Sequence, residues 1–198
     1  EVRRVPQVRL VILGPPGAGK GTQAELLSEA LGIPHISTGD LFRANISQGT
    51  PVGIEAKKYL DAGNLVPSEI TVDMVRARLA EPDAVKGFLL DGFPRTVAQA
   101  QALDKMLSAR GQKIDSVLRL KVDEPALIER IKKRFEEQGR PDDNPEVFVT
   151  RLAQYNAQTA PLLPYYEGQG KLTELDGMGS VEAVASSIDE ALAPISVG

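Results

Sequence analysis

A glycine-rich stretch near the start of the chain carries the clearest chemistry. Gly14-Pro15-Pro16-Gly17-Ala18-Gly19-Lys20 matches G-x-x-x-x-G-K, and it follows an apolar run and precedes a helix-period stretch, which is the context the motif requires. Glycines let backbone N–H groups face phosphate oxygens, the helix N-terminus adds its dipole, and Lys20 would reach the β and γ phosphates. Gly21 stands where the general motif has Ser or Thr, which leaves Thr22 as the candidate hydroxyl for magnesium. The alternative is a tight strand–helix turn that binds nothing.

An acidic residue at the end of a buried apolar run is the expected partner of this loop. Phe88-Leu89-Leu90 leads directly into Asp91. A carboxylate in that place can hold Mg²⁺, most simply through water. The alternative is that Asp91 only caps the next turn.

The pattern of apolar residues predicts the scaffold that positions both features. Apolar runs alternate with helix-period stretches, which predicts an α/β fold with a parallel sheet covered by helices on both faces. Ligands of such sheets bind beyond the carboxyl ends of the strands. We expect strands at residues 8–13, 35–37, 87–91, 116–122 and 171–175. We expect helices at 20–31, 40–48, 54–61, 67–79, 99–110, 125–134, 145–166 (kinked at Pro161 and Pro164) and 181–192.

Composition narrows the class of protein. The chain has 198 residues, 42% of them hydrophobic and 25% charged, which suits one globular domain. A net charge of −4 argues against a nucleic-acid partner, and no apolar run approaches the roughly 18 residues of a membrane span. The short apolar run after the basic start is interpreted as a first strand and not a signal peptide. With no cysteine and one histidine, we expect a cytoplasmic protein without disulfides and without zinc.

Four stretches resemble the adenylate kinase family, in the family's order. They are residues 14–24 (GPPGAGKGTQA), 36–43 (ISTGDLFR), 91–95 (DGFPR) and 159–163 (TAPLL). The resemblance covers residue 8 onward. It implies a P-loop NTPase-like three-layer fold with a five-stranded parallel sheet, and a reversible phosphoryl transfer from MgATP to AMP that gives two ADP and serves adenine nucleotide homeostasis. It also implies a monomer.

The same resemblance divides a single kinase domain, residues 1–198, into functional parts. The core would comprise residues 8–36, 67–133 and 142–198, with an AMP-binding helical flap at 37–66 and a very short lid at 134–141. Residues 1–7 precede the family's usual start and are assigned no role. Only five residues separate Arg134 from Arg140, too few for a small sheet with its own core. Gly139 permits a sharp turn and Pro141 stiffens the exit, so we predict a helix–turn–helix hinge.

Site residues follow from the resemblance, motif by motif. The ATP side is assigned to Gly14, Pro15, Gly17, Ala18, Gly19, Lys20, Gly21, Thr22, Arg134 and the backbone of Gly179. The AMP side is assigned to Thr38, Arg43, Asn64, Leu65, Val66, Gly92, Phe93, Pro94, Arg95 and Gln99, the last of which would read adenine. Arg140 and Arg151 would bridge AMP and the transferring phosphate.

Five cations are expected to be catalytic, because two polyanions can meet only with positive charge between them. They are Lys20, Arg95, Arg134, Arg140 and Arg151, and guanidinium forks match phosphate geometry. The acceptor is already an anion and needs no strong general base. The one histidine, His35, is therefore interpreted as a strand or pocket-edge residue.

Several of these residues have simpler interpretations. Ser37 or Thr38 can cap a helix, and Thr96-x-x-Gln99 fits a capping box in which Gln99 bonds backbone and not adenine. Arg43 and Arg151 can be exposed helix surface. The run that ends at Arg134 can be a solvated basic turn.

Three other functions compete with adenylate kinase activity. A UMP or CMP kinase of the same family is disfavoured by Thr38 and Gln99, since by resemblance the pyrimidine enzymes differ there. A GTPase switch would need N-K-x-D, which is absent, and the D-x-x-G match at residues 176–179 comes far too late. A non-catalytic nucleotide-binding P-loop protein is disfavoured because every expected charged residue is present.

Overall fold

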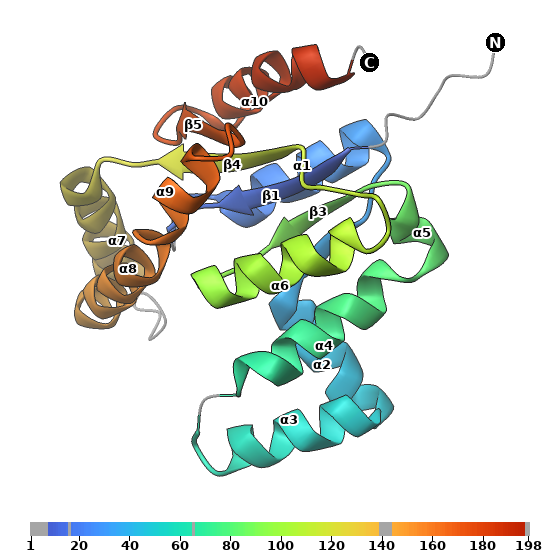
Figure 1. Cartoon of the computed structure of the whole chain (residues 1–198). Helices are drawn as coiled ribbons and strands as arrows, with labels where there is room; N and C mark the ends of the chain where they lie inside the picture. Colours follow the sequence, from blue (N-terminus) through green and yellow to red (C-terminus); the bar gives the residue numbers. More distant parts are fainter. Residues whose placement is uncertain (1–7, 16, 65, 139–143, 197–198) are drawn as a thin grey trace.

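A five-stranded parallel sheet forms the centre of the molecule, as predicted. The computed structural model describes residues 8–15, 17–64, 66–138 and 144–196. Within these, the strand order is β2-β3-β1-β4-β5 and every pairing is parallel (Figure 1). The strands are β1 (Arg9–Leu13), β2 (His35–Ser37), β3 (Phe88–Asp91), β4 (Ser116–Lys121) and β5 (Leu172–Asp176). Ile12 and Ser37 both pair with Asp91, so the ends of three strands meet at one edge.

Helices cover both faces of this sheet, which confirms the three-layer prediction. α1 (Lys20–Leu31) and α10 (Val181–Ser196) cover one face, and α4 (Ser68–Leu79), α6 (Val97–Ser108) and α9 (Leu162–Glu167) cover the other (Figure 1). Successive residues of β1 point to opposite faces of the sheet. Leu10 and Ile12 pack on the α1 side, whereas Val11 and Leu13 pack on the α6 side. Because both faces are covered, the central strands β1 and β3 are mostly apolar.

Two helices beyond the carboxyl edge of the sheet form a closely packed pair. They are α2 (Thr38–Gln48) and α3 (Pro51–Asp61), with α4 packed against both. A Cβ added at Gly53 of α3 would lie 2.1 Å from the carbonyl oxygen of Asn45 in α2. The Thr50 hydroxyl caps α3 by accepting from the Gly53 N–H at 3.0 Å. The glycine therefore sets how near the two helices approach.

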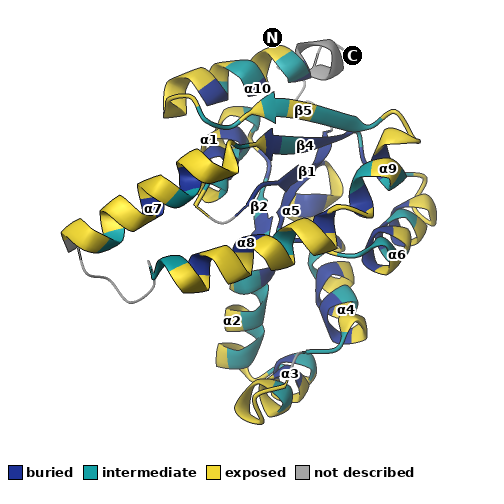
Figure 2. Cartoon of the chain, turned by 90° about the vertical axis from the view of Figure 1, so that its left-hand side faces the viewer, coloured by how far each residue is buried: buried dark blue, intermediate teal, exposed yellow. Residues whose placement is uncertain are grey.

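Another helix pair, α7 (Glu124–Gln138) and α8 (Pro145–Thr159), has its own small apolar seam. The seam consists of Leu127, Ile131, Phe148 and Leu152. Figure 2 shows the outward surfaces of both helices exposed, while the central strand β1 is buried. The side chain of Asn144 caps α8 through the Glu146 N–H at 2.9 Å, which confirms the predicted N-cap.

The predicted element boundaries were wrong in several places, each for a local reason. α7 continues four residues past Arg134 to Gln138, because no helix breaker precedes Gly139. The expected kink at Pro161 is a break, so α8 and α9 are separate. α2, α3 and α6 begin earlier than predicted, at their capping residues. The short α5 (Pro82–Val85) was not predicted. No helix in the described ranges is long and apolar enough to span a membrane.

Candidate functional site

A hollow of about 600 Å³ lies at the carboxyl edge of the sheet and joins three predicted motifs. The phosphate loop lines it from one side, the segment after β3 from another, and α8 from a third. Its lining includes these predicted site residues: Gly14, Pro15, Gly17, Gly19, Lys20, Gly21, Thr22, Gly92, Pro94, Arg95 and Arg151. The fold thus brings together residues from distant parts of the chain.

The phosphate loop has the backbone that its glycines predict. Gly17 and Gly19 have φ values of 81° and 77°, in the left-handed region. A Cβ at Gly17 would also lie 3.1 Å from the ring of Phe148, so a side chain there would press against α8. Helix α1 begins at Lys20 with no side-chain cap. Its first N–H groups are therefore available to an anion.

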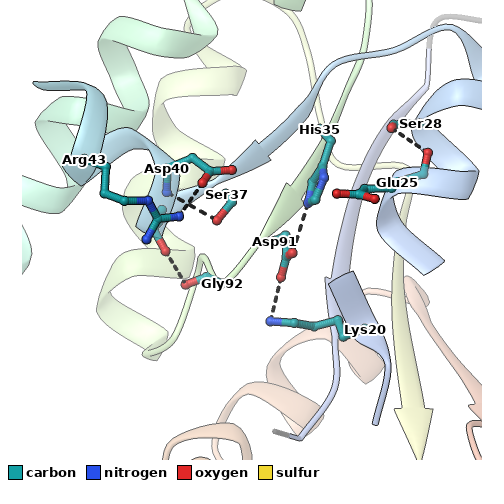
Figure 3. A network of polar contacts seen from close by, with 10 residues as sticks. Lys20, Glu25, Ser28, His35, Ser37, Asp40, Arg43, Asp91 and Gly92 are labelled. Atoms are coloured by element: carbon teal, nitrogen blue, oxygen red, sulfur yellow. Dashed lines mark hydrogen bonds and ion pairs between the residues drawn. The ribbon is translucent and has the colours of Figure 1, made fainter. Parts of the chain in front are cut away.

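A buried carboxylate pairs with the loop lysine and with the only histidine (Figure 3). Lys20 Nζ lies 2.6 Å from Asp91 Oδ1, and His35 Nε2 donates to Asp91 Oδ2 at 2.9 Å. Burial raises the pKa of Asp91, but the His35 hydrogen bond and the Lys20 charge outweigh this and hold that pKa below its usual value. The bond to Asp91 raises the pKa of His35 against the opposing effect of burial. Asp91 is thus ionised at neutral pH beside the phosphate loop.

The donor set here fits magnesium held jointly with a nucleotide. Among the described residues no group of three or more His, Asp or Glu could hold a metal ion alone. Mg²⁺ usually takes one or two carboxylates, the substrate phosphates and several waters. Asp91 can supply such a carboxylate, and Thr22 is a hydroxyl on the wall of the hollow.

The segment after β3 is held by bonds that converge on one carbonyl. Thr38 Oγ1 donates to the Gly92 carbonyl at 3.4 Å, and Arg95 Nε donates to it at 3.0 Å. Gly92 has φ of 86°, and a Cβ there would lie 2.8 Å from Thr38 Oγ1. Thr38 is therefore buried against this turn. Ser37 and not Thr38 caps α2, through the Asp40 N–H at 3.5 Å.

The side chain of Gln99 is used by the protein itself. Its Oε1 accepts from the Arg95 N–H at 2.8 Å, and its Nε2 donates to Ser68 at 3.3 Å. Thr96 caps the same helix by accepting from the Gln99 N–H at 3.2 Å. The alternative in which Gln99 bonds backbone is thus confirmed. The N–H that its side chain binds belongs to Arg95, the residue before the cap, and not to Thr96 itself. That Gln99 also reads adenine stays a prediction.

Other predicted residues do not line this hollow. Arg43 is exposed on α2 and pairs with Asp40, and Phe93 is fully buried, so a nucleotide contact at this residue stays a prediction. Asn64 lines a separate hollow on α3. The remaining members of this set are Ala18, Val66, Arg134 in the exposed part of α7, and Gly179 in the loop before α10. Leu65 and Arg140 lie outside the described residues, as do Pro16, Gly139 and Pro141.

The sequence interpretation missed one wall of the hollow. Gln154, Tyr155, Gln158 and Thr159 of α8 line it together with Arg151. The signal was available, since residues three and four apart share one face of a helix. Burial raises the pKa of Tyr155, so its phenol stays protonated at neutral pH.

The fold and this hollow together define a P-loop nucleotide-binding protein: a parallel sheet, a glycine loop that opens a helix, and a carboxylate at the end of a neighbouring strand. A family model described as adenylate kinase matches residues 12–171. The chain therefore belongs to the adenylate kinase family.

Relatives support the same assignment over nearly the whole chain. The adenylate kinase of Caulobacter vibrioides (strain NA1000 / CB15N) is 69% identical over 191 residues, which cover 96% of this chain and 100% of the relative. That of Corynebacterium urealyticum is 57% identical over 180 residues, covering 91% and 96%. That of Phenylobacterium zucineum is 55% identical over 185 residues, covering 93% and 97%.

Proposed function

We propose that this chain is an adenylate kinase, which transfers a phosphoryl group reversibly from MgATP to AMP and gives two ADP. The observation that carries the proposal is one hollow lined by the phosphate loop with Lys20 and by Arg95 and Arg151, with Asp91 paired to Lys20. Phosphoryl transfer requires alignment and neutralised charge more than a base. The relatives named above carry the same activity in their names.

The strand order gives the two nucleotides different sides of the site. The phosphate loop follows β1, which has β3 and β2 on one side and β4 and β5 on the other. Thr38 and Gly92 bond each other on the β2–β3 side, where we place AMP. ATP then has its phosphates at the loop and its base toward β4 and β5.

Charge complementarity explains what each side chain would do. Lys20 would exchange its contact with Asp91 for the phosphates of ATP and stabilise the negative charge that develops during transfer. Arg95 and Arg151 line the space between the two nucleotides and would bind AMP and the moving phosphoryl group. Magnesium, when bound, would neutralise phosphate charge, with Asp91 and Thr22 as the nearest protein groups. Closing the flap and lid would keep out water, which would otherwise hydrolyse ATP.

The lid is proposed to be residues 134–141, of which 134–138 form the carboxyl end of α7 and 139–141 lie outside the described residues. It would bury little surface, so its closure should depend on Arg134 and Arg140. Arg140→Ala is expected to lower kcat far more than it weakens ATP binding, because the contact matures in the transition state. Glu136→Ala, an exposed neighbour on α7, is the matched control and should be near wild type. Equal kinetics for both variants would refute the lid mechanism.

One coupled assay tests the proposed activity. ATP is supplied with AMP, CMP, UMP or GMP in turn, and ADP formation is recorded. We expect turnover with AMP well above the other three. Preference for UMP or CMP would favour the pyrimidine alternative, and ATP binding without turnover would favour the non-catalytic one. The dependence on Mg²⁺, the monomeric state and the cytoplasmic location stay predictions.

A further inference from the structure

Gln23, near the start of α1, is a buried polar side chain that has no role in the phosphate loop itself. Gln23 is 4% exposed. Its Nε2 donates to the carbonyl of Val181, at the start of α10, at 3.1 Å and across 158 residues of sequence. An amide nitrogen must face a carbonyl acceptor, so the orientation of the carboxamide is fixed. Gln23 therefore ties the helix that carries Lys20 to the loop that precedes α10.

The same loop is held from the opposite side by the sheet. The Gly177 N–H donates to the carbonyl of Lys121, at the end of β4, at 2.7 Å. A Cβ at Gly177 would lie 3.0 Å from that oxygen, so the loop sits tightly on the strand. Asp176 Oδ1 also accepts from the Met178 N–H at 2.9 Å. The segment from Gly177 to Val181 is thus bonded to β4 at its first residue and to α1 at its last.

This loop lies where the base of the donor nucleotide would lie. The phosphates sit after β1, and β4 and β5 follow at successive spacings, so the loop after β5 is about 10 Å along the sheet edge. A second hollow, of about 810 Å³, opens at the ends of β4 and β5 with Met178 in its wall. Gly179 in the same loop is the residue assigned to the base of ATP.

We propose that Gln23 is a positioning residue that sets the distance between the phosphate loop and the base-contacting loop at residues 177–180. This inference rests on the proposed function for the location of the base. Gln23 lines neither the hollow at the phosphate loop nor the hollow at the ends of β4 and β5. It acts through Val181, so its contribution is to the binding of the base and not of the phosphates.

The energetics of Gln23 distinguish this role from ordinary packing. Its Oε1 is buried and accepts no hydrogen bond from the described residues. An unpaired buried oxygen is unfavourable, so an apolar side chain of the same length should be tolerated by the fold at least as well. The Val181 carbonyl is the first in α10 and keeps an N–H partner one turn along the helix. Removing the carboxamide should therefore spare stability and weaken ATP binding.

The test compares Gln23→Met with wild type by titration calorimetry, using MgATP and magnesium triphosphate as separate probes. We expect the Kd for ATP to rise about three- to tenfold, the effect of one neutral hydrogen bond. The Kd for triphosphate, the KM for AMP and the melting temperature should stay within error of wild type, or the melting temperature should rise. Ile188→Val is the matched control, because Ile188 lines the same groove between α1 and α10 and its truncation loosens packing without touching the bond. It should lower the melting temperature and leave the preference for ATP over triphosphate unchanged.

Three results would overturn the inference: unchanged ATP binding in Gln23→Met, an equal loss for ATP and triphosphate, or the same selective loss in Ile188→Val. Failure of the proposed function looks different. In that case the wild-type protein would not phosphorylate AMP, yet Gln23→Met would still weaken ATP selectively over triphosphate.

Discussion

Replacing Gly53 by alanine is expected to weaken AMP binding while leaving ATP binding intact. The new Cβ would lie 2.1 Å from the Asn45 carbonyl oxygen, whereas real Cβ contacts stay beyond 3.0 Å. α2 and α3 must therefore separate by roughly 1 Å, a typical overpacking cost of about 1–3 kcal/mol. Alanine regains about 1 kcal/mol through helix propensity. The net loss should appear mainly in the proposed flap, since Gly53 is remote from the phosphate loop.

Steady-state kinetics with each substrate varied in turn decide this case. We expect the KM for AMP to rise about tenfold, equivalent to about 1.4 kcal/mol, and the KM for ATP to stay within about twofold. Lys57→Ala, on the exposed side of the same helix and with only a 4.0 Å contact to Asp61, should behave like wild type. An unchanged KM for AMP in a folded Gly53→Ala protein would refute the assignment of α2 and α3 to the AMP side.

Three further outcomes are expected. Lys20→Ala should lower kcat by several orders of magnitude, because its charge would follow the moving phosphoryl group; near-normal turnover would end the phosphate-loop assignment. Gln99→Ala should erode the preference for AMP over pyrimidine monophosphates by about 1–3 kcal/mol, and unchanged selectivity would mean that the side chain only caps its helix. The bond to Asp91 raises the pKa of His35 in the folded protein, so protonated His35 stabilises the fold. This stabilisation is fully present when the pH is below the unfolded pKa of about 6.5, and it is lost as the pH rises through the folded pKa. The lowered pKa of Asp91 acts oppositely, so its contribution is lost as acid protonates it. The free energies of unfolding of wild type and His35→Gln, measured by urea unfolding from pH 5 to 9, should therefore converge as the pH rises. A constant difference between the two free energies across this range would contradict the pairing.

The elements that the sequence predicted well are those whose signal is local. β1 and β3 are buried on both faces, so they stand out as continuous apolar runs. The phosphate loop was recognisable because its glycines serve a backbone conformation of adjacent residues. The start of α3 was displaced because Thr50, its cap, was not weighed against the first apolar residue.

Contacts between distant segments could not be predicted from the sequence alone. The bonds of His35 to Asp91 and of Gln23 to Val181 span 56 and 158 residues, and they exist only because strand order brings the segments together. Gln99 is instructive in another way. Its capping role was readable from spacing to Thr96, but its bond to Ser68 depends on how α4 packs against α6.

The apolar seam between α7 and α8 gives this helix pair a stability of its own. Its four buried side chains are separate from the two clusters that hold the sheet, so the pair can open by local unfolding at a lower free energy than the whole domain. Amide protons of α7 and α8 should consequently exchange with solvent sooner than those of β1. Phe148 belongs to this seam and also lies against Gly17 of the phosphate loop. Each local opening of the pair therefore removes a wall from the loop, and nucleotide phosphates bound there should slow hydrogen exchange along both helices.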